Sequence, residues 1–364
     1  MPPLFSSKGP SEAQILEVLK TVQDPELGRD IVSLGMVNNL KVDGSKVTVT
    51  LVLTTPACPV REEFQDTVKQ AILAVPGVQS ADVTLDANVR GSAKIQSTNL
   101  IQGVRNIIAV GSGKGGVGKS TVSVNLAVSL AKSGAKVGLL DADIYGPNIP
   151  TMLGVHAPIQ TGSGIKPAFN YGVNAISMGF FIPKGEPVVW RGPMIHGAIQ
   201  QLLKDVQWGE LDYLIVDLPP GTGDASLSLA QLVPLTGAVI VVTPQDVAIE
   251  DGAKAIAMFR KLNVPILGLV ENMSSFVCPH CNETIDIFGK GGGQEACQQY
   301  EIEFLGDIPI DPRIRIGGDE GAPIVAAHPD SPAAQRFMDI SKVIAGKISV
   351  QNLEEAGVQW ISMV

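Results

Sequence analysis

The chain has 364 residues, which is long enough for more than one hydrophobic core, so we expect one large domain and one smaller domain. Its 27 Lys and Arg against 36 Asp and Glu give a formal net charge of -9, which argues against a broad nucleic-acid-binding face. No apolar run reaches the roughly 20 residues that span a bilayer, and the N-terminus lacks the apolar core of a signal peptide. We therefore expect a cytoplasmic protein that binds neither nucleic acid nor membrane.

Residues 1–87 are predicted to form a small α+β domain. The pair Asp43-Gly44 favours a hairpin between two strand-like runs. The order helix, strand, strand, helix, strand indicates a compact α+β fold. The expected elements are helices over 11–22 and 60–75 and strands over 35–42, 46–53 and 78–85.

Residues 88–104 lack apolar periodicity and are predicted to be a linker. Over residues 105–350, continuous Val, Ile and Leu runs alternate with helical patterns, which is typical of a doubly wound parallel α/β sheet. Residues 351–364 are expected to be a C-terminal tail. Strands are predicted over 106–110, 136–141, 213–217, 238–243, 266–271 and 304–309, and helices over 121–131, 196–204, 224–231, 249–262, 293–300 and 333–344.

A complete P-loop motif, G-x-x-x-x-G-K-S, lies between the first of these strands and the first of these helices. Its glycines let backbone N–H groups converge on phosphate oxygens, and the helix N-terminus adds partial positive charge. Lys119 would neutralise the β- and γ-phosphates, Ser120 would ligate Mg²⁺, and Thr121 would reach the α-phosphate. The predicted ATP-binding residues are Gly113, Lys114, Gly115, Gly116, Val117, Gly118, Lys119, Ser120 and Thr121.

Carboxylates follow two of the other strands, at the sheet edge where ligands bind in such folds. Asp217 ends the run Leu-Ile-Val-Asp and is predicted to hold Mg²⁺ together with Ser120. Asp141 and Asp143 follow another strand, and Asp143 is the candidate that positions the attacking water. The alternative for these two aspartates is a solvated turn.

The stretch K-G-G-V-G-K-S resembles the deviant Walker A motif of the signature-lysine ATPases, the group of MinD, ParA and the nitrogenase iron protein. The resemblance implies that Lys114 reaches across a nucleotide sandwich dimer to the partner's phosphates, so that a homodimer forms the active site. It also implies that Asn272, after the strand 266–271, contacts adenine. From the residues alone, Asn272 is equally well explained as a turn residue.

Four cysteines are too few for a disulfide framework in a chain of this length. Cys278 and Cys281 can hold one metal together, but a closed site needs four ligands. Three arrangements remain open: a zinc knuckle with His280 and Cys297, a redox dithiol, or half of a site that a second copy completes. The third is favoured, because two pairs in a two-fold dimer would supply four thiolates for a [4Fe-4S] cluster.

The other two cysteines lie in different settings. Cys297 falls on a predicted helix and is expected to be packed in the core rather than to bind metal. Cys58 lies where a strand turns into a helix, and a helix N-terminus can lower a thiol pKa. Cys58 is therefore a candidate transfer thiol, with a small buried cysteine as the alternative.

Further motifs make the resemblance more specific. D-A-D-I-Y-G-P-N-I-P, W-R-G-P-M, V-D-L-P-P-G-T-G-D and E-N-M-S followed by C-P-H-C resemble the Mrp/ApbC family of iron-sulfur carrier ATPases. D-P-E-L-G and T-T-P-A-C-P resemble the small assembly-factor domain related to SufT and PaaD. The resemblance implies an ATPase that passes a labile [4Fe-4S] cluster to apoproteins and works with cluster assembly factors. A MinD- or ParA-like positioning ATPase and a zinc-binding metallochaperone NTPase are the alternatives.

Overall fold

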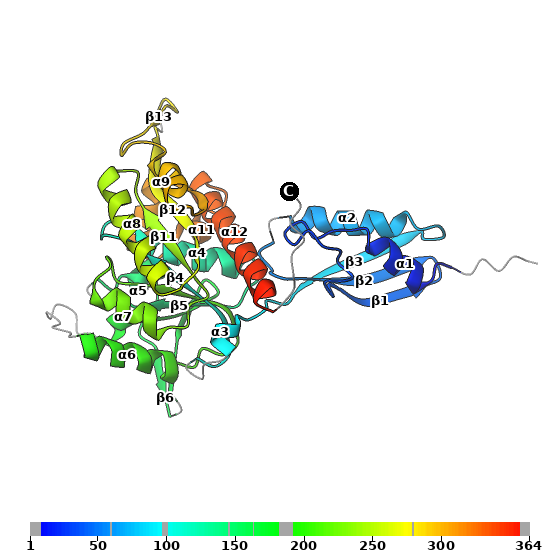
Figure 1. Ribbon diagram of the computed structural model, residues 1–364, viewed down its shortest axis with the longest axis horizontal. Coiled ribbons are helices and arrows are strands. Elements are labelled where there is room, and N and C mark those ends of the chain that lie inside the picture. The colour runs from blue at the N-terminus through cyan, green and yellow to red at the C-terminus, as the bar shows by residue number, and fades with distance from the viewer. Residues whose placement is uncertain are drawn as a thin grey trace, which may run out of the picture. The chain divides into compact units, whose positions relative to one another are not determined.

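The computed structural model describes residues 9–58, 60–96, 101–144, 146–162, 164–181, 192–278 and 280–356. The chain divides into two compact units (Figure 1), the first made of Met1–Arg90 with Ser349–Val364 and the second of Gly91–Ile348. Among the described helices, none is both long and apolar enough to cross a membrane.

The first unit is an α+β fold, as predicted. Its sheet has the order β1-β2-β3, with β1 and β2 antiparallel and β2 and β3 parallel. Alternate residues of β2 are buried, and they form one core with the buried faces of both helices. Ser11 caps the first helix, because its Oγ accepts a hydrogen bond from the Gln14 N–H at 3.3 Å. The elements are α1 (Glu12–Leu19), β1 (Val37–Asp43), β2 (Lys46–Leu53), α2 (Arg61–Leu73) and β3 (Ser80–Ala87).

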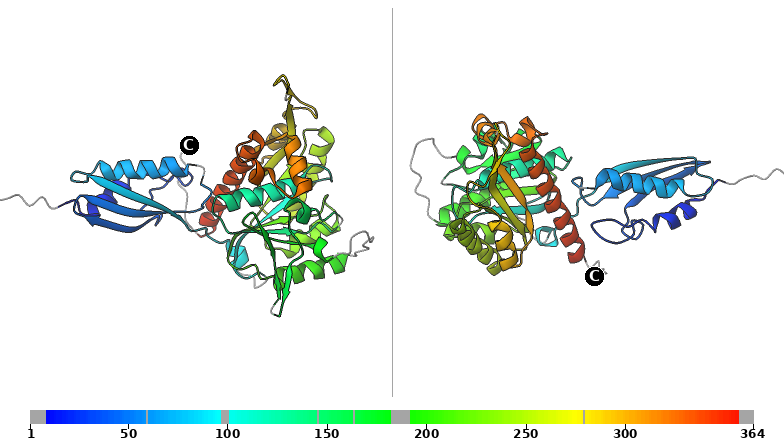
Figure 2. Two further views of the ribbon diagram at one scale, coloured as in Figure 1. Left: turned by 180° about the vertical axis from the view of Figure 1, so that it is seen from behind. Right: turned by 90° about the horizontal axis from the view of Figure 1, so that it is seen from above.

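The second unit is built on a mostly parallel sheet with helices on both faces (Figure 2). Every residue of its strands β5 and β11 is buried, as expected for strands covered on both sides. The strands are β4 (Val104–Gly111), β5 (Val137–Asp141), β8 (Ala168–Asn170), β9 (Val173–Ser177), β10 (Leu211–Asp217), β11 (Gly237–Val242), β12 (Ile266–Val277), β13 (Thr284–Ile285) and β14 (Phe304–Ile310).

The strand order is β13-β12-β11-β4-β10-β5-β9-β8, with β14 also paired to β12. Among the described strands of this sheet, two pairings are antiparallel: β8 with β9 and β13 with β12. A separate short hairpin comprises β6 (Ile159–Thr161) and β7 (Gly164–Lys166). The helices are α3 (Ala93–Gln96), α4 (Lys119–Lys132), α5 (Ile149–Met152), α6 (Gly192–Asp205), α7 (Asp224–Leu232), α8 (Asp246–Lys261), α9 (Gly292–Tyr300), α10 (Pro312–Glu320), α11 (Ile324–Ala327) and α12 (Pro332–Glu355).

The structure differs from the sequence expectation in the predicted linker and in the predicted C-terminal tail. Within residues 88–104, predicted to be a linker, α3 forms, and Ile95 and Ile101 are buried in the core of the second unit. A helix this short lacks the periodicity that reveals longer ones. Helix α12 continues through residues 351–355, which were expected to belong to the tail.

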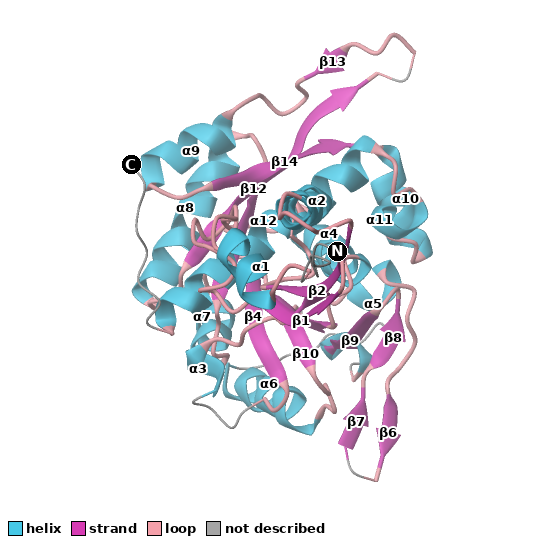
Figure 3. Cartoon of the chain, turned by 90° about the vertical axis from the view of Figure 1, so that its right-hand side faces the viewer, coloured by secondary structure: helices cyan, strands magenta, loops and turns pink. Residues whose placement is uncertain are grey.

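Strand β12 also departs from the expectation. The apolar run predicted a strand over 266–271, but β12 continues to Val277 and pairs with the short β13. The two strands form an arm that projects from the unit (Figures 1 and 3). We call residues 275–287 the cysteine arm, because Cys278 and Cys281 lie between its strands.

Candidate functional site

The P-loop joins the end of β4 to the start of α4, as predicted. Position 113 requires glycine because it lies against α8, where an added Cβ would come 1.9 Å from the Asp251 carbonyl oxygen. The loop borders a pocket of about 400 Å³. The lining residues are Ser112, Lys114, Gly115, Gly116, Gly118, Lys119, Ser120, Thr121, Asp143, Gly146, Asn148, Met152 and Pro220.

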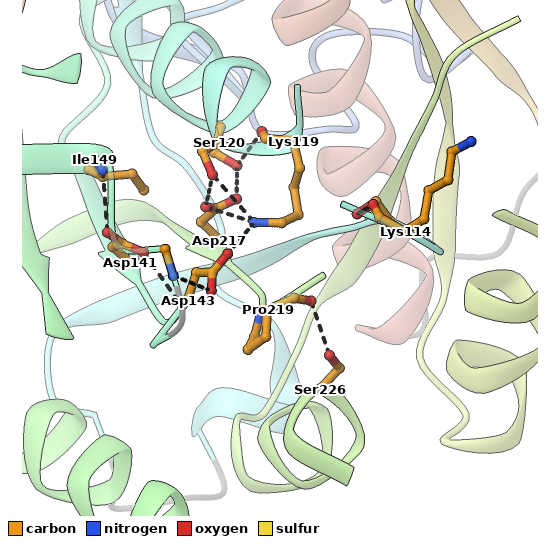
Figure 4. A network of polar contacts seen from close by, with 12 residues as sticks. Lys114, Lys119, Ser120, Asp141, Asp143, Ile149, Asp217, Pro219 and Ser226 are labelled. Atoms are coloured by element: carbon orange, nitrogen blue, oxygen red, sulfur yellow. Dashed lines mark hydrogen bonds and ion pairs between the residues drawn. The ribbon is translucent and has the colours of Figure 1, made fainter. Parts of the chain in front are cut away.

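A buried ion pair joins Lys119, which lines this pocket, to Asp217 (Figure 4). The Lys119 Nζ lies 2.9 Å from Asp217 Oδ2 and 3.9 Å from Asp143 Oδ2. The side chains of Lys119 and Asp217 are 6% and 0% exposed. The structure thus brings together Lys119, Asp143 and Asp217, three of the residues that the sequence predicted for this site.

Two serine hydroxyls complete the surroundings of Asp217. Ser120 Oγ donates to Asp217 Oδ2 at 2.6 Å, and Ser123 Oγ donates to Asp217 Oδ1 at 2.7 Å. A carboxylate beside a hydroxyl provides the hard oxygen ligands that Mg²⁺ prefers, so this pair fits the ion. Sequence reasoning missed Ser123, although its spacing from Ser120 places both on one helix face.

Asp141 holds the loop that follows β5. Its Oδ1 accepts from the Asp143 N–H at 3.2 Å, and its Oδ2 accepts from the Ile149 N–H at 3.3 Å and from Ser177 Oγ at 2.8 Å. Burial, and next the charge of Asp217, raise the pKa of Asp141 to about 8. The carboxyl therefore positions Asp143 at the pocket. Sequence reasoning gave no role to Ser177, which lies on an unpredicted strand.

Lys114 lines the same pocket from the other side. Its side chain points away from Lys119 and Asp217 (Figure 4). Its charge contributes, after the hydrogen bond from Lys254, to a lowered pKa of the Asp251 carboxyl on α8. The ammonium group therefore lies outside the cluster formed by Lys119, Asp143 and Asp217.

Asn272 lies behind the P-loop. It is buried in β12, and its Nδ2 donates to the Val117 carbonyl oxygen at 2.9 Å. It does not belong to the residues that line the pocket. Its contact with adenine, implied by the resemblance, therefore stays a prediction.

The cysteine arm presents two thiols in one turn. Cys278 is partly exposed and Cys281 is exposed. Hydrogen bonds from the backbone N–H groups of His280 and then Cys281 lower the pKa of the Cys278 thiol. The turn is closed by the Asn282 N–H, which donates to the Cys278 carbonyl at 2.9 Å, and Asn282 takes the left-handed φ of 59° that asparagine tolerates. Such a turn favours the thiolate form of Cys278.

The remaining candidate ligands do not complete a site within one chain. Cys297 is buried in the core on α9, as expected for a packed cysteine. In the described part of the chain, no three His, Cys, Asp or Glu side chains come together in a group that could hold a metal. The zinc knuckle with His280 and Cys297 is therefore not formed there.

Cys58 lies in the first unit beside two carboxyl groups. It is 9% exposed, and its thiol is hydrogen-bonded to Glu26. Burial, and next the charge of Glu26, raise the pKa of Cys58 to about 12. A helix N-terminus can lower a thiol pKa, but at Cys58 burial and a neighbouring carboxyl outweigh the backbone N–H of Val60. Its role as a transfer thiol stays a prediction.

Both units match known protein families. Residues 103–345 match the ParA family model described as NUBPL iron-transfer P-loop NTPase. Residues 12–85 match the model described as iron-sulfur cluster assembly protein. The two matches fall on the two units of the fold.

Relatives match over almost the whole chain. A protein of Deinococcus radiodurans named iron-sulfur cluster carrier protein is 52% identical over 344 residues, covering 94% of this chain and 97% of that protein. A Synechocystis protein of the same name is 49% identical over 346 residues, covering 93% of this chain and 98% of that protein.

Solved structures match about two thirds of the chain. A nucleotide-binding protein from Archaeoglobus fulgidus in complex with ADP is 41% identical, with a TM-score of 0.55 over 65% of this chain and 92% of its own. The cell division ATPase MinD of Pyrococcus furiosus is 26% identical, with a TM-score of 0.50 over 66% of this chain and 98% of its own. The chain therefore belongs to the iron-sulfur cluster carrier family of P-loop NTPases, with an iron-sulfur cluster assembly domain ahead of the NTPase domain.

Proposed function

We propose that this protein is an ATP-hydrolysing carrier that receives a labile [4Fe-4S] cluster and passes it to apoproteins. The observation that carries the proposal is the turn at Cys278 and Cys281, where two accessible thiols lie together and backbone N–H groups favour the thiolate. Thiolates are the ligands of iron-sulfur clusters. The cluster is the cargo of this site rather than a permanent part of the fold.

The cluster is held between two copies of the chain. One arm supplies two thiolates, and in a two-fold dimer the same surface of the partner supplies two more. The arm also exposes apolar side chains next to the thiols: Val277, Ile285 and Ile287 are 50%, 47% and 51% exposed. An apolar surface around a cluster limits the access of water to it.

The nucleotide site supplies the energy for this exchange. Lys119 moves from Asp217 to the β- and γ-phosphates of ATP, and the P-loop N–H groups and Thr121 hold the remaining phosphate oxygens. Ser120 and Asp217 hold Mg²⁺, which neutralises phosphate charge when bound. Asp143, kept in place by Asp141, accepts a hydrogen bond from the attacking water.

Lys114 acts on the partner's nucleotide. Its ammonium points away from its own Lys119 and Asp217, so it is available to a second copy (Figure 4). A cation that stabilises phosphoryl-transfer charge from another subunit acts as an arginine finger does. Hydrolysis then requires the same dimer that completes the cluster site. Apo iron-sulfur proteins and cluster assembly factors are the expected partners.

Anaerobic reconstitution with iron and sulfide tests the cluster assignment. We expect wild type to bind about four iron and four sulfide per dimer, which is the content of one [4Fe-4S] cluster. Cys278→Ser with Cys281→Ser should lose this iron and sulfide, whereas Cys297→Ser, a buried cysteine of the same unit, should keep it. A normal iron load in the double variant would refute the assignment.

Metal analysis separates the cluster from zinc. Protein purified without oxygen should contain iron and sulfide that are lost in air, because the two thiols of each copy lie at an accessible turn. A stoichiometric zinc content that survives in air would instead support the zinc-binding metallochaperone.

A further inference from the structure

Strand β12 connects the P-loop to the cysteine arm. Asn272, near its middle, donates from Nδ2 to the Val117 carbonyl oxygen at 2.9 Å, a link between residues 155 positions apart. Asn272 is 5% exposed. The same strand ends at Val277, directly before Cys278. One continuous strand thus contacts the phosphate loop at one point and carries the cluster thiols at its end.

The contact acts on a peptide group that faces the pocket. The C=O of Val117 and the N–H of Gly118 belong to one planar trans peptide and point in opposite directions. Asn272 holds the carbonyl from behind, and Gly118 lines the pocket in front. The side chain of Asn272 therefore orients an N–H group where the P-loop meets phosphate.

The fit at this point leaves no room for a larger residue. Gly118 has a φ of 81°, and a Cβ there would come 2.2 Å from Asn272 Nδ2. A displacement of the Val117–Gly118 peptide by a bound phosphate must therefore move the Asn272 side chain or break its hydrogen bond.

A bend follows Asn272 in the strand. Met273 takes the left-handed φ of 58°, which an unbranched non-glycine residue adopts only where the surroundings impose it. The pairing of β12 with β14 shifts in register between Asn272 and Phe276. This irregular segment separates the part of β12 inside the sheet from the part that enters the cysteine arm.

We propose that Asn272 is a positioning residue that transmits phosphate binding in the P-loop to Cys278 and Cys281 through the bend at Met273. The inference rests on the proposed function, because it describes how ATP controls the accessibility of the same two thiols. ATP binding changes the exposure of the thiols, and Asn272 carries that change along one strand.

The test measures thiol alkylation in metal-free full-length protein, so it does not depend on a bound cluster. Iodoacetamide labelling followed by peptide mass spectrometry gives the rates at Cys278 and Cys281, with and without a saturating non-hydrolysable ATP analogue and Mg²⁺. In wild type we expect the analogue to change the rate by about fivefold or more, a usual size for coupling between two sites. No change in wild type would refute the proposal.

Asn272→Asp keeps the size of the side chain but cannot donate to the Val117 carbonyl. At analogue concentrations that saturate the variant, its alkylation rates should be the same with and without nucleotide. Ser274→Ala is the matched control, because it removes a partly buried side-chain hydrogen bond of the same strand that goes to Asp307 rather than to the P-loop. This control should keep the wild-type response. A response retained in Asn272→Asp would overturn the proposal.

A second variant tests the same transmission from the P-loop to the thiols if Asn272→Asp does not fold or does not bind nucleotide. Met273→Gly keeps Asn272 and makes the bend flexible, since glycine adopts positive φ freely. It should bind the analogue and lose most of the nucleotide response, and an unchanged response would overturn the proposal. Iron loading of wild type is measured separately, so failure of the carrier function and failure of the relay give different results.

Discussion

Replacing Lys119 by alanine should destabilise the protein even before ATP is added. The Lys119 ammonium lies 2.9 Å from Asp217, and the two side chains are 6% and 0% exposed. Removing one partner of a buried ion pair costs about 3–5 kcal/mol, because the other charge stays buried without compensation. The hydroxyls of Ser120 and Ser123 still donate to Asp217, so we expect a loss near the lower end, about 3 kcal/mol.

Thermal unfolding without nucleotide measures this loss. In a unit of this size, about 3 kcal/mol corresponds to a Tm lower by roughly 6–12 °C. Tryptophan fluorescence can report the transition, since Trp208 is buried in the core of the second unit. The control is Lys119→Ala combined with Asp217→Asn, which removes both charges and should recover most of the lost Tm.

Two results would refute this reasoning. One is a Lys119→Ala protein that unfolds at the wild-type temperature. The other is a double variant that is no more stable than the single one. If the prediction holds, loss of ATPase activity in Lys119→Ala reports lost stability as well as lost phosphate binding.

Three further predictions concern other residues. Lys114→Ala should bind ATP normally but hydrolyse it at least about 10³-fold more slowly than wild type in single-turnover assays. Full hydrolysis activity in this variant would contradict a role of Lys114 in trans. Ser123→Ala should raise the Mg²⁺ concentration needed for half-maximal ATPase activity by about tenfold, because the Ser123 hydroxyl orients the Asp217 carboxylate. An unchanged Mg²⁺ titration would exclude this role of Ser123. Burial, and next Asp24, raise the pKa of Glu26 from 4.5 to about 7, so its contribution to the stability of the first unit is present below pH 4.5 and lost as pH rises through 7. Glu26→Gln should therefore slow hydrogen exchange in β2 at pH 8.5 by about tenfold relative to wild type and leave it similar at pH 4.5, whereas a uniform effect at both pH values would contradict the shifted pKa.

Much of the fold could be predicted because its elements are long and locally encoded. The buried parallel strands are apolar runs, and the helices between them repeat apolar residues at helical spacing. Strands β8 and β9 were missed because they are short, with three and five residues, and β8 lies at the sheet edge. The continuation of β12 beyond residue 271 was missed because Asn272 and Ser274 interrupt its apolar pattern.

The candidate site could likewise be predicted where short motifs encode it, but not where it depends on residues distant in the sequence. Motif spacing predicted Lys119, Asp143 and Asp217, and the structure brings these three side chains together. Ser123 and Ser177 were not found, since their partners Asp217 and Asp141 are 94 and 36 positions away. The raised pKa of Cys58 could not be predicted, because the Glu26 carboxyl beside it comes from another part of the chain.

The sequence by itself determined the two-unit organisation, the phosphate loop with its two lysines, and the cysteine pair, because each depends on residues that are neighbours along the chain. Only the tertiary structure decided that Lys119 neutralises Asp217, that Cys58 is kept protonated, and that Asn272 holds the P-loop on the strand that leads to Cys278. The physical reason is that charge pairing, burial and hydrogen bonding depend on distance in space, and folding brings together groups that the sequence keeps far apart.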